Sequence, residues 1–268
     1  MALLVEFILR LAFGLAAGMS LTSPRQITSG YYRNHLYVTL GLATLAALLS
    51  RTVAPAAFWP AVVTAAISYI GSVCWLAERP RAGRFALVLV TVAALWGALE
   101  VAAVLAELRQ LPELRPTLDD QQIVRLGTIS GGLGVLSTVS SGLLLGITMA
   151  AMLLGHWYLN SPTMELAPLR MLILVLAAAL LLQVILSTMG LVGEIFSVEQ
   201  LSTRWVFCVL MRWLFGLVGV ALLTWMAWQT LKIPNTQSAT GILYVAVIGT
   251  FVGETMALLL SAESLFPL

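Results

Sequence analysis

Charged residues are scarce in this chain, since Asp, Glu, Lys and Arg together make up 10% of its 268 residues. A typical soluble domain carries about 25%. Hydrophobic residues account for 60% of the chain, and its mean hydropathy is +0.98. Because so apolar a chain cannot cover a surface that faces water, we expect an integral membrane protein that has the lipid bilayer as a partner. The net charge of +2 is too small to predict nucleic-acid binding.

Cysteine and histidine are equally rare, with two of each. So few side chains cannot form a Cys-rich zinc or iron–sulfur site. The spans described next place Cys74 and Cys208 near opposite membrane faces, which is too far for a disulfide. No pair of residues has the spacing of a nucleophile with its base or of a metal-binding motif. These absences argue against an enzyme that acts on its own.

Long hydrophobic runs, in contrast, fill the chain. Eight of them are 2–22, 36–54, 58–77, 85–106, 131–155, 169–191, 205–229 and 240–262. A helix of about 20 residues crosses the membrane core, so these runs leave only short loops. The sequence therefore predicts an all-α bundle of about eight transmembrane helices, with residues 1–268 as a single polytopic transmembrane domain. Glu6 and Arg10 interrupt the first run, which favours a retained helix over a cleaved signal peptide.

Basic residues indicate the orientation. With the N-terminus outside, the expected inner loops hold Arg25, Arg33, Arg79, Arg81, Arg84, Arg170 and Lys232. The expected outer loops hold Arg51, Arg109, Arg115, Arg125 and Arg204. Because basic residues favour the cytoplasmic side, we expect a protein of the bacterial cytoplasmic (inner) membrane with both termini outside.

The longest loop, 107–130, carries a pattern typical of a helix start. The segment Thr117-Leu-Asp-Asp120 resembles a capping box. It predicts a short helix that continues to about Leu126 and lies along the outer membrane interface.

A weak repeat links the two ends of the chain. The run 2–22 contains Arg10-Leu-Ala-Phe-Gly-Leu15, and the run 205–229 contains Arg212-Trp-Leu-Phe-Gly-Leu217. Each is followed by a loop with a proline and then by the next run. We therefore consider the first two and the last two helices as candidates for equivalent hairpins. Glycines four residues apart also predict close helix packing in three runs. They are Gly14 and Gly18, Gly142 and Gly146, and Gly249 and Gly253.

Ionisable residues inside the runs give the strongest functional signal. They are Glu6, Arg10, Glu100, Arg212 and Glu254, and all fall in the expected outer half of the membrane. Such residues are costly in lipid and usually face the inside of a bundle. We expect one charge cluster in which two arginines meet three carboxylates, leaving one carboxylate to bind a proton or a cation. The alternative is a cluster that only locks helices together.

Two further groups of polar residues stand out. His35 and His156 are expected at the inner face, where two imidazoles could ligate haem b or line a quinone site. Histidine is also ordinary at an aqueous interface. The run 131–155 is rich in hydroxyl groups, which predicts a central helix. They belong to Ser137, Thr138, Ser140, Ser141 and Thr148. Gln183 predicts a hydrogen bond between helices.

Two classes of function stay open. The first, which the short loops and the two histidines favour, is a membrane subunit of a larger complex with other membrane or peripheral subunits, of a respiratory, electron-transport or haem- or quinone-handling kind. The second is a secondary transporter or an ion- or proton-conducting protein that uses the buried arginine and glutamate residues.

Overall fold

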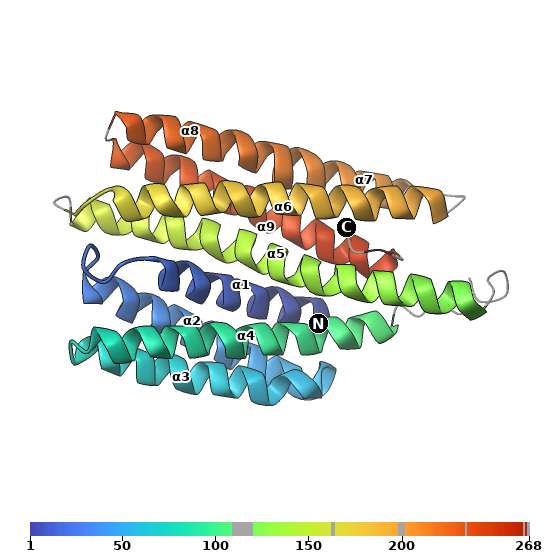
Figure 1. Ribbon diagram of the computed structural model, residues 1–268, viewed down its shortest axis with the longest axis horizontal. Coiled ribbons are helices and arrows are strands. Elements are labelled where there is room, and N and C mark those ends of the chain that lie inside the picture. The colour runs from blue at the N-terminus through green and yellow to red at the C-terminus, as the bar shows by residue number, and fades with distance from the viewer. Residues whose placement is uncertain (109–119, 162–163, 198–201, 234, 265, 267–268) are drawn as a thin grey trace.

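The computed structural model describes residues 1–268 apart from 109–119, 162–163, 198–201, 234, 265 and 267–268, and it contains only helices in the described part (Figure 1). The first half comprises α1 (Ala2–Leu21), α2 (Ser29–Val53), the 3₁₀ helix η1 (Pro55–Ala57), α3 (Phe58–Leu76) and α4 (Pro80–Leu108). The second half comprises α5 (Asp120–Asn160), α6 (Ala167–Ser197), α7 (Thr203–Met211), η3 (Arg212–Gly219), α8 (Val220–Lys232) and α9 (Thr236–Glu263).

Eight helical segments of the described chain are long and apolar enough to cross a membrane. The all-α class and the eight apolar runs expected from the sequence are thus confirmed. The seventh segment, Thr203–Lys232, is built from α7, η3 and α8 in succession. The start of α1 and the end of α9 lie toward the same end of the molecule (Figure 1). We name this the terminal end, and the other the opposite end.

Several helices extend beyond the hydrophobic runs. The second run was expected to begin at residue 36, but α2 begins at Ser29 because Tyr31, Tyr32 and His35 are buried in its first turns. The short helix expected to end near Leu126 is not a separate element, because α5 is continuous from Asp120 to Asn160. Residues 117–119 of the capping-box pattern lie outside the described residues. With 41 residues, α5 is about 60 Å long and exceeds the membrane core.

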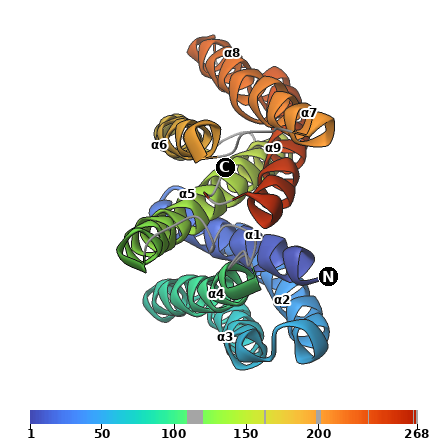
Figure 2. The ribbon, with the colours of Figure 1, turned by 90° about the vertical axis from the view of Figure 1, so that its right-hand side faces the viewer.

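The eight segments form two bundles of four. In the first bundle, α1 and α3 each pack against both α2 and α4. In the second, α5 and α8 each pack against both α6 and α9. Figure 2 shows α1 to α4 on one side of the molecule and α6 to α9 on the other, with α5 crossing obliquely between them. Each bundle therefore closes its own ring of neighbouring helices.

The main contact between the bundles is the crossing of α1 and α5, which run in the same direction (Figure 1). Glycine makes the crossing close, because a Cβ atom at Gly14 would overlap the backbone carbonyl of Gly142. Gly146 meets Gly14 from the next turn of α5. The close helix packing that we expected from Gly14, Gly142 and Gly146 is thus confirmed.

The first and seventh helices, the candidates for a repeat, have different packing environments. Of the apolar window in α1, 72% is buried, and the window in α5 has the same value. The window in Thr203–Lys232 is 28% buried, because this segment lies at the edge of the second bundle. The shared Arg–x–x–Phe–Gly–Leu pattern thus occurs in two different packing environments, and the repeat stays a prediction.

Candidate functional site

The first buried ion pair lies on α1. Arg10 donates through Nη2 to Glu6 Oε1, one helical turn earlier, and both residues are buried. The same guanidinium reaches across to α5, where Nη2 donates to Thr138 Oγ1 at 3.0 Å and Nη1 donates to Ser141 Oγ at 3.1 Å. A single arginine therefore joins the two bundles through one carboxylate and two hydroxyl groups.

The second buried ion pair joins the seventh and eighth segments. Arg212, the first residue of η3, donates through Nη1 to Glu254 Oε1 on α9 at 2.5 Å. Arg212 is 1% exposed and Glu254 is fully buried. The Nη2 atom of Arg212 also lies 3.4 Å from Ser187 Oγ on α6. The pair thus ties together three segments of the second bundle.

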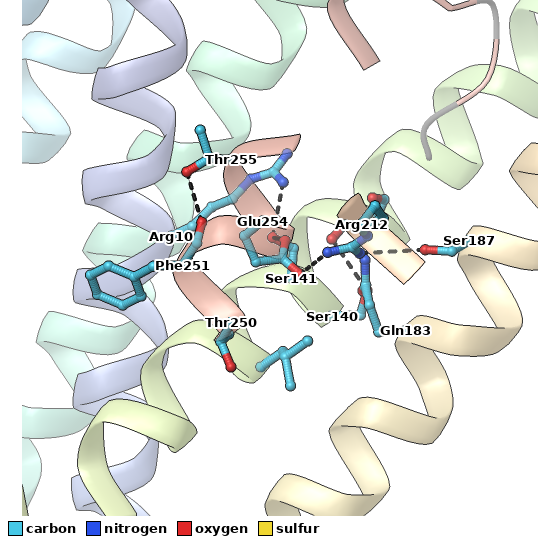
Figure 3. Close-up of polar contacts among 12 residues, drawn as sticks. Arg10, Ser140, Ser141, Gln183, Ser187, Arg212, Thr250, Phe251, Glu254 and Thr255 are labelled. Atoms are coloured by element: carbon cyan, nitrogen blue, oxygen red, sulfur yellow. Dashed lines mark hydrogen bonds and ion pairs between the residues drawn. The ribbon is translucent and has the colours of Figure 1, made fainter. Parts of the chain in front are cut away.

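Ser141 links the two ion pairs. Its hydroxyl accepts from Arg10 and donates to Glu254 Oε2. The contacts form a continuous chain from Glu6 through Arg10, Ser141 and Glu254 to Arg212, which we name the charge network. Figure 3 shows four of its members, Arg10, Ser141, Glu254 and Arg212, projecting toward one another from α1, α5, α9 and η3. Beside it, Ser140 of α5 donates to the side-chain oxygen of Gln183 on α6, which is the helix-to-helix bond expected for that glutamine.

Glu100 does not join the charge network, which corrects the expected cluster of five. Its carboxylate accepts a hydrogen bond from Trp96 Nε1 on the same helix, at 2.9 Å, and the residue is only half-buried. Hydropathy alone does not reveal which side of a helix faces the bundle, so the position looked equivalent to the other four. The network holds two arginines and two glutamates and is balanced in charge, so the spare third carboxylate is absent from it.

Close contacts between helix backbones bring the side chains of this network together. Gly14 follows Arg10 by one turn, and Gly216 follows Arg212 by one turn. A Cβ at Gly216 would overlap the backbone of Gly253, the neighbour of Glu254 in sequence. η3 is wound as a π-helix, and such windings occur frequently at functional sites. Short side chains such as serine can bridge the arginines and glutamates because the backbones approach this closely.

Some polar atoms of the network lack a hydrogen bond. Three of its buried atoms, Glu6 Oε2, Arg10 Nε and Arg212 Nε, have no partner among the described residues. At 1.5 Å per residue, Arg10 lies about 12 Å from the start of α1, which in a helix crossing a membrane core about 30 Å thick would be close to its middle. Buried polar atoms without partners are costly at such a depth. Glu6 Oε2 can therefore still accept a proton or a hydrogen bond, and the two Nε–H groups can still donate to a small polar species.

The two histidines lie near the opposite end, in different surroundings. His35 is buried on α2, where its Nδ1 is 2.6 Å from the carbonyl oxygen of Tyr31. His156 is exposed on α5, and its Nδ1 lies 3.1 Å from Tyr244 Oη on α9. The ring of Trp157, the next residue after His156, is 6.3 Å from the His35 ring. Both histidine-bearing segments are therefore adjacent, although one ring is buried and the other is exposed.

The sequence interpretation missed several polar residues. Ser141 and Thr138 were expected on a central helix but were not assigned to the charge cluster. Glu194, on α6, is 4% exposed and accepts a hydrogen bond from the backbone N–H of Phe266 at 3.3 Å. It lies three residues beyond the expected end of its run, so hydropathy placed it in a loop. A helical-wheel projection of the run 131–155 would have placed Thr138 and Ser141 one turn apart.

Comparisons with known proteins give no indication of function, because no protein-family model, curated protein or solved structure matches this chain. Among the described residues, no group of three or more His, Cys, Asp or Glu side chains is placed to hold a metal ion.

Proposed function

We propose that this chain is a secondary transporter or proton-conducting membrane protein in which the charge network is the proton-binding site. The observation that carries the proposal is the continuous chain of contacts from Glu6 to Arg212, buried at the junction of the two bundles. Ionisable residues within transmembrane helices usually serve an ion, proton or substrate path.

The position of the network supports transport over a purely structural role. In many secondary transporters, the coupling-ion site lies near the bilayer midplane, between two halves of the fold, beside helices whose winding is interrupted. Here Arg10 belongs to the first bundle and Glu254 to the second, and Arg212 begins the π-helical η3. All three conditions meet at one site.

The chemistry of the site suits a proton. Protonation of Glu254 removes the charge that holds Arg212 and changes the hydrogen bond donated by Ser141. Ser141 also accepts a hydrogen bond from Arg10. A proton on Glu254 in the second bundle therefore alters the contact between Ser141 and Arg10 of the first bundle. That coupling is what a rocking motion of two halves requires.

Proton flux into proteoliposomes tests the proposal. Vesicles that contain the purified chain and a trapped pH-sensitive dye are given a potassium diffusion potential. We expect the wild type to acidify the lumen and Glu254→Gln to lose most of this flux. Glu100→Gln removes a membrane carboxylate outside the network and should retain wild-type flux.

A double variant separates transport from helix locking. Glu254→Gln leaves Arg212 buried without its carboxylate, which destabilises the fold by about 3–5 kcal/mol. Arg212→Gln combined with Glu254→Gln removes both charges, so we expect the folded yield to recover while the flux stays lost. A well-folded double variant with wild-type flux would overturn the proposal and leave helix locking as the role of the network.

A membrane subunit of a larger complex is the second candidate, and the adjacency of the two histidine-bearing segments supports it. If His35 and His156 ligate haem b, the protein purified with haem available should show a Soret band, and either substitution by alanine should remove it. A colourless wild-type protein would exclude the haem form of this candidate. Copurifying subunits would support the complex.

A further inference from the structure

Four arginines gather around one pocket at the opposite end of the molecule. They are Arg25 in the segment between α1 and α2, Arg79 before α4, and Arg81 and Arg84 in its first turns. The pocket has a volume of about 850 Å³, and Ser23 also lines it. All four arginine side chains are exposed, and none is within ion-pairing distance of a carboxylate in the described part of the chain.

Such a concentration of positive charge is unfavourable without an anion. Four like charges around one pocket repel one another. Arg81 and Arg84 also lie at the N-terminal end of α4, where the helix dipole favours negative charge. A bound anion would relieve both effects, and its phosphate oxygens could pair with guanidinium groups in the bidentate geometry.

An apolar groove lies further along α1 and α4, on the side toward the terminal end. It has a volume of about 530 Å³ and lies where α1, α4, α5 and α6 meet, at the junction of the two bundles. Val88 in the groove is one turn beyond Arg84 on α4, and Leu21 is two residues before Ser23. The charged pocket and the apolar groove therefore follow one another along the same two helices.

We propose that the basic pocket and the apolar groove together bind an anionic phospholipid, with its phosphate headgroup among the arginines and an acyl chain in the groove. Basic pockets between transmembrane helices are suited to anionic lipid headgroups. A free anion would use the pocket but has no use for the groove, whose lining is almost entirely apolar. The lipid would lie in the seam between the bundles and stabilise their contact.

Lipid retention measured by native mass spectrometry tests the headgroup half of the site. We expect the purified chain to retain phosphatidylglycerol in preference to phosphatidylcholine with the same acyl chains. Arg81→Gln with Arg84→Gln should weaken phosphatidylglycerol binding about 25-fold, from about five-fold for each arginine. The matched control is Arg33→Gln with Lys232→Gln, which removes two basic residues of the same end that do not line the pocket and should leave binding unchanged.

The groove is tested separately. Ala178 is exposed in the groove, and its neighbour Ala177 is exposed outside it. Ala178→Phe should fill the groove and reduce retention of phosphatidylglycerol to that of phosphatidylcholine, whereas Ala177→Phe should not. If Arg81 and Arg84 variants fold poorly, Arg25→Gln with Arg79→Gln, outside regular helix, provides the same test.

Three outcomes would overturn the proposal. Equal retention of both lipids would indicate only a nonspecific lipid shell. Equal loss in the pocket and control variants would indicate an effect of net charge. Glycerol 3-phosphate binding as tightly as phosphatidylglycerol, with no effect of Ala178→Phe, would identify a site for a soluble phosphate compound.

Discussion

Single residues in the charge network have complementary roles. Each arginine meets one carboxylate, and its other bonded Nη donors face neutral hydroxyl groups: Thr138 and Ser141 for Arg10, and Ser187 for Arg212. A second carboxylate at each arginine would leave a negative charge buried without a partner, at a cost of several kcal/mol. The hydroxyl groups accept from these Nη donors without adding charge, while both Nε atoms stay without a partner in the described part of the chain.

Thr138 and Thr148 lie on the same helix and give a matched pair of substitutions. Thr138→Val removes an acceptor of the Arg10 guanidinium, so we expect the free energy of unfolding to fall by about 1.5–3 kcal/mol. The Thr148 hydroxyl bonds only the carbonyl of Leu144 in its own helix among the described contacts, so Thr148→Val should change stability by less than about 0.5 kcal/mol. Unfolding in mixed micelles measures both. Equal losses would mean that Thr138 makes no special contribution.

At the scale of the helix, glycines determine which elements can meet. The α1–α5 crossing depends on Gly14 and Gly146, and the η3–α9 crossing depends on Gly216 and Gly253. In lipid, no hydrophobic effect drives helices together, so close backbone contact supplies much of the association energy. In each crossing, one glycine lies one helical turn after an arginine of the charge network: Gly14 after Arg10, and Gly216 after Arg212. Helix contact and charge pairing therefore depend on each other.

Gly14→Ala and Gly41→Ala should have effects of opposite sign. A Cβ at Gly14 would overlap the backbone of α5, so the crossing must open, and we expect a loss of about 1–3 kcal/mol. Gly41 on α2 has nothing within 4 Å of the position of a Cβ, so alanine should stabilise its helix by about 0.5–1 kcal/mol. Thermal unfolding in detergent compares the two variants. A stable Gly14→Ala protein would contradict the close crossing.

At the scale of the whole molecule, two bundles each close their own ring of helix contacts. Each bundle also contains one complete ion pair, Glu6 with Arg10 or Arg212 with Glu254. Neither half needs a charge from the other to be neutral at its core. The halves are therefore suited to form separately and then associate through α1 and α5.

Cutting the chain tests this independence. When residues 1–113 and 114–268 are expressed together as two fragments, we expect them to associate in the membrane and copurify. A cut after residue 78 separates α3 from α4 inside the first bundle and should give less complex. Association is measured by affinity purification of one tagged fragment. Equal recovery for the two cuts would contradict the division into two bundles.

The sequence predicted what depends on local composition. Eight spans follow from hydropathy, because each helix must cover its own backbone polar groups in lipid. The spacing of four residues between Glu6 and Arg10 is enough to put both on one helix face, where the structure pairs them. Glu100 was wrongly grouped with them, because the side of α4 that faces the bundle is decided by packing against α1 and α3. The sequence alone also does not show that α1 and the seventh span differ in burial, since similar sequences can lie in different packing environments.

The role of Ser141 was also beyond the reach of the sequence. Its hydroxyl bridges Arg10, 131 residues earlier in the chain, and Glu254, 113 residues later. Only the folded arrangement of α1, α5 and α9 brings the three together. Hydroxyl enrichment indicated a central helix and could not identify which hydroxyl group serves as the bridge.

The two ion pairs differ in when their partners become available. Glu6 and Arg10 are four residues apart and enter the membrane together on one helix. Arg212 and Glu254 are 42 residues apart, which at 5–20 residues per second means a delay of about two to eight seconds during synthesis. Until α9 emerges, the seventh span carries an arginine that costs about 2.5–3.5 kcal/mol to insert alone. We expect a chain that ends at Lys232 to insert this span poorly and Arg212→Leu to restore insertion, as measured by glycosylation mapping. The eighth span, α9, then acts as an internal chaperone for the seventh span. Its synthesis decides whether the seventh span stays in the bilayer.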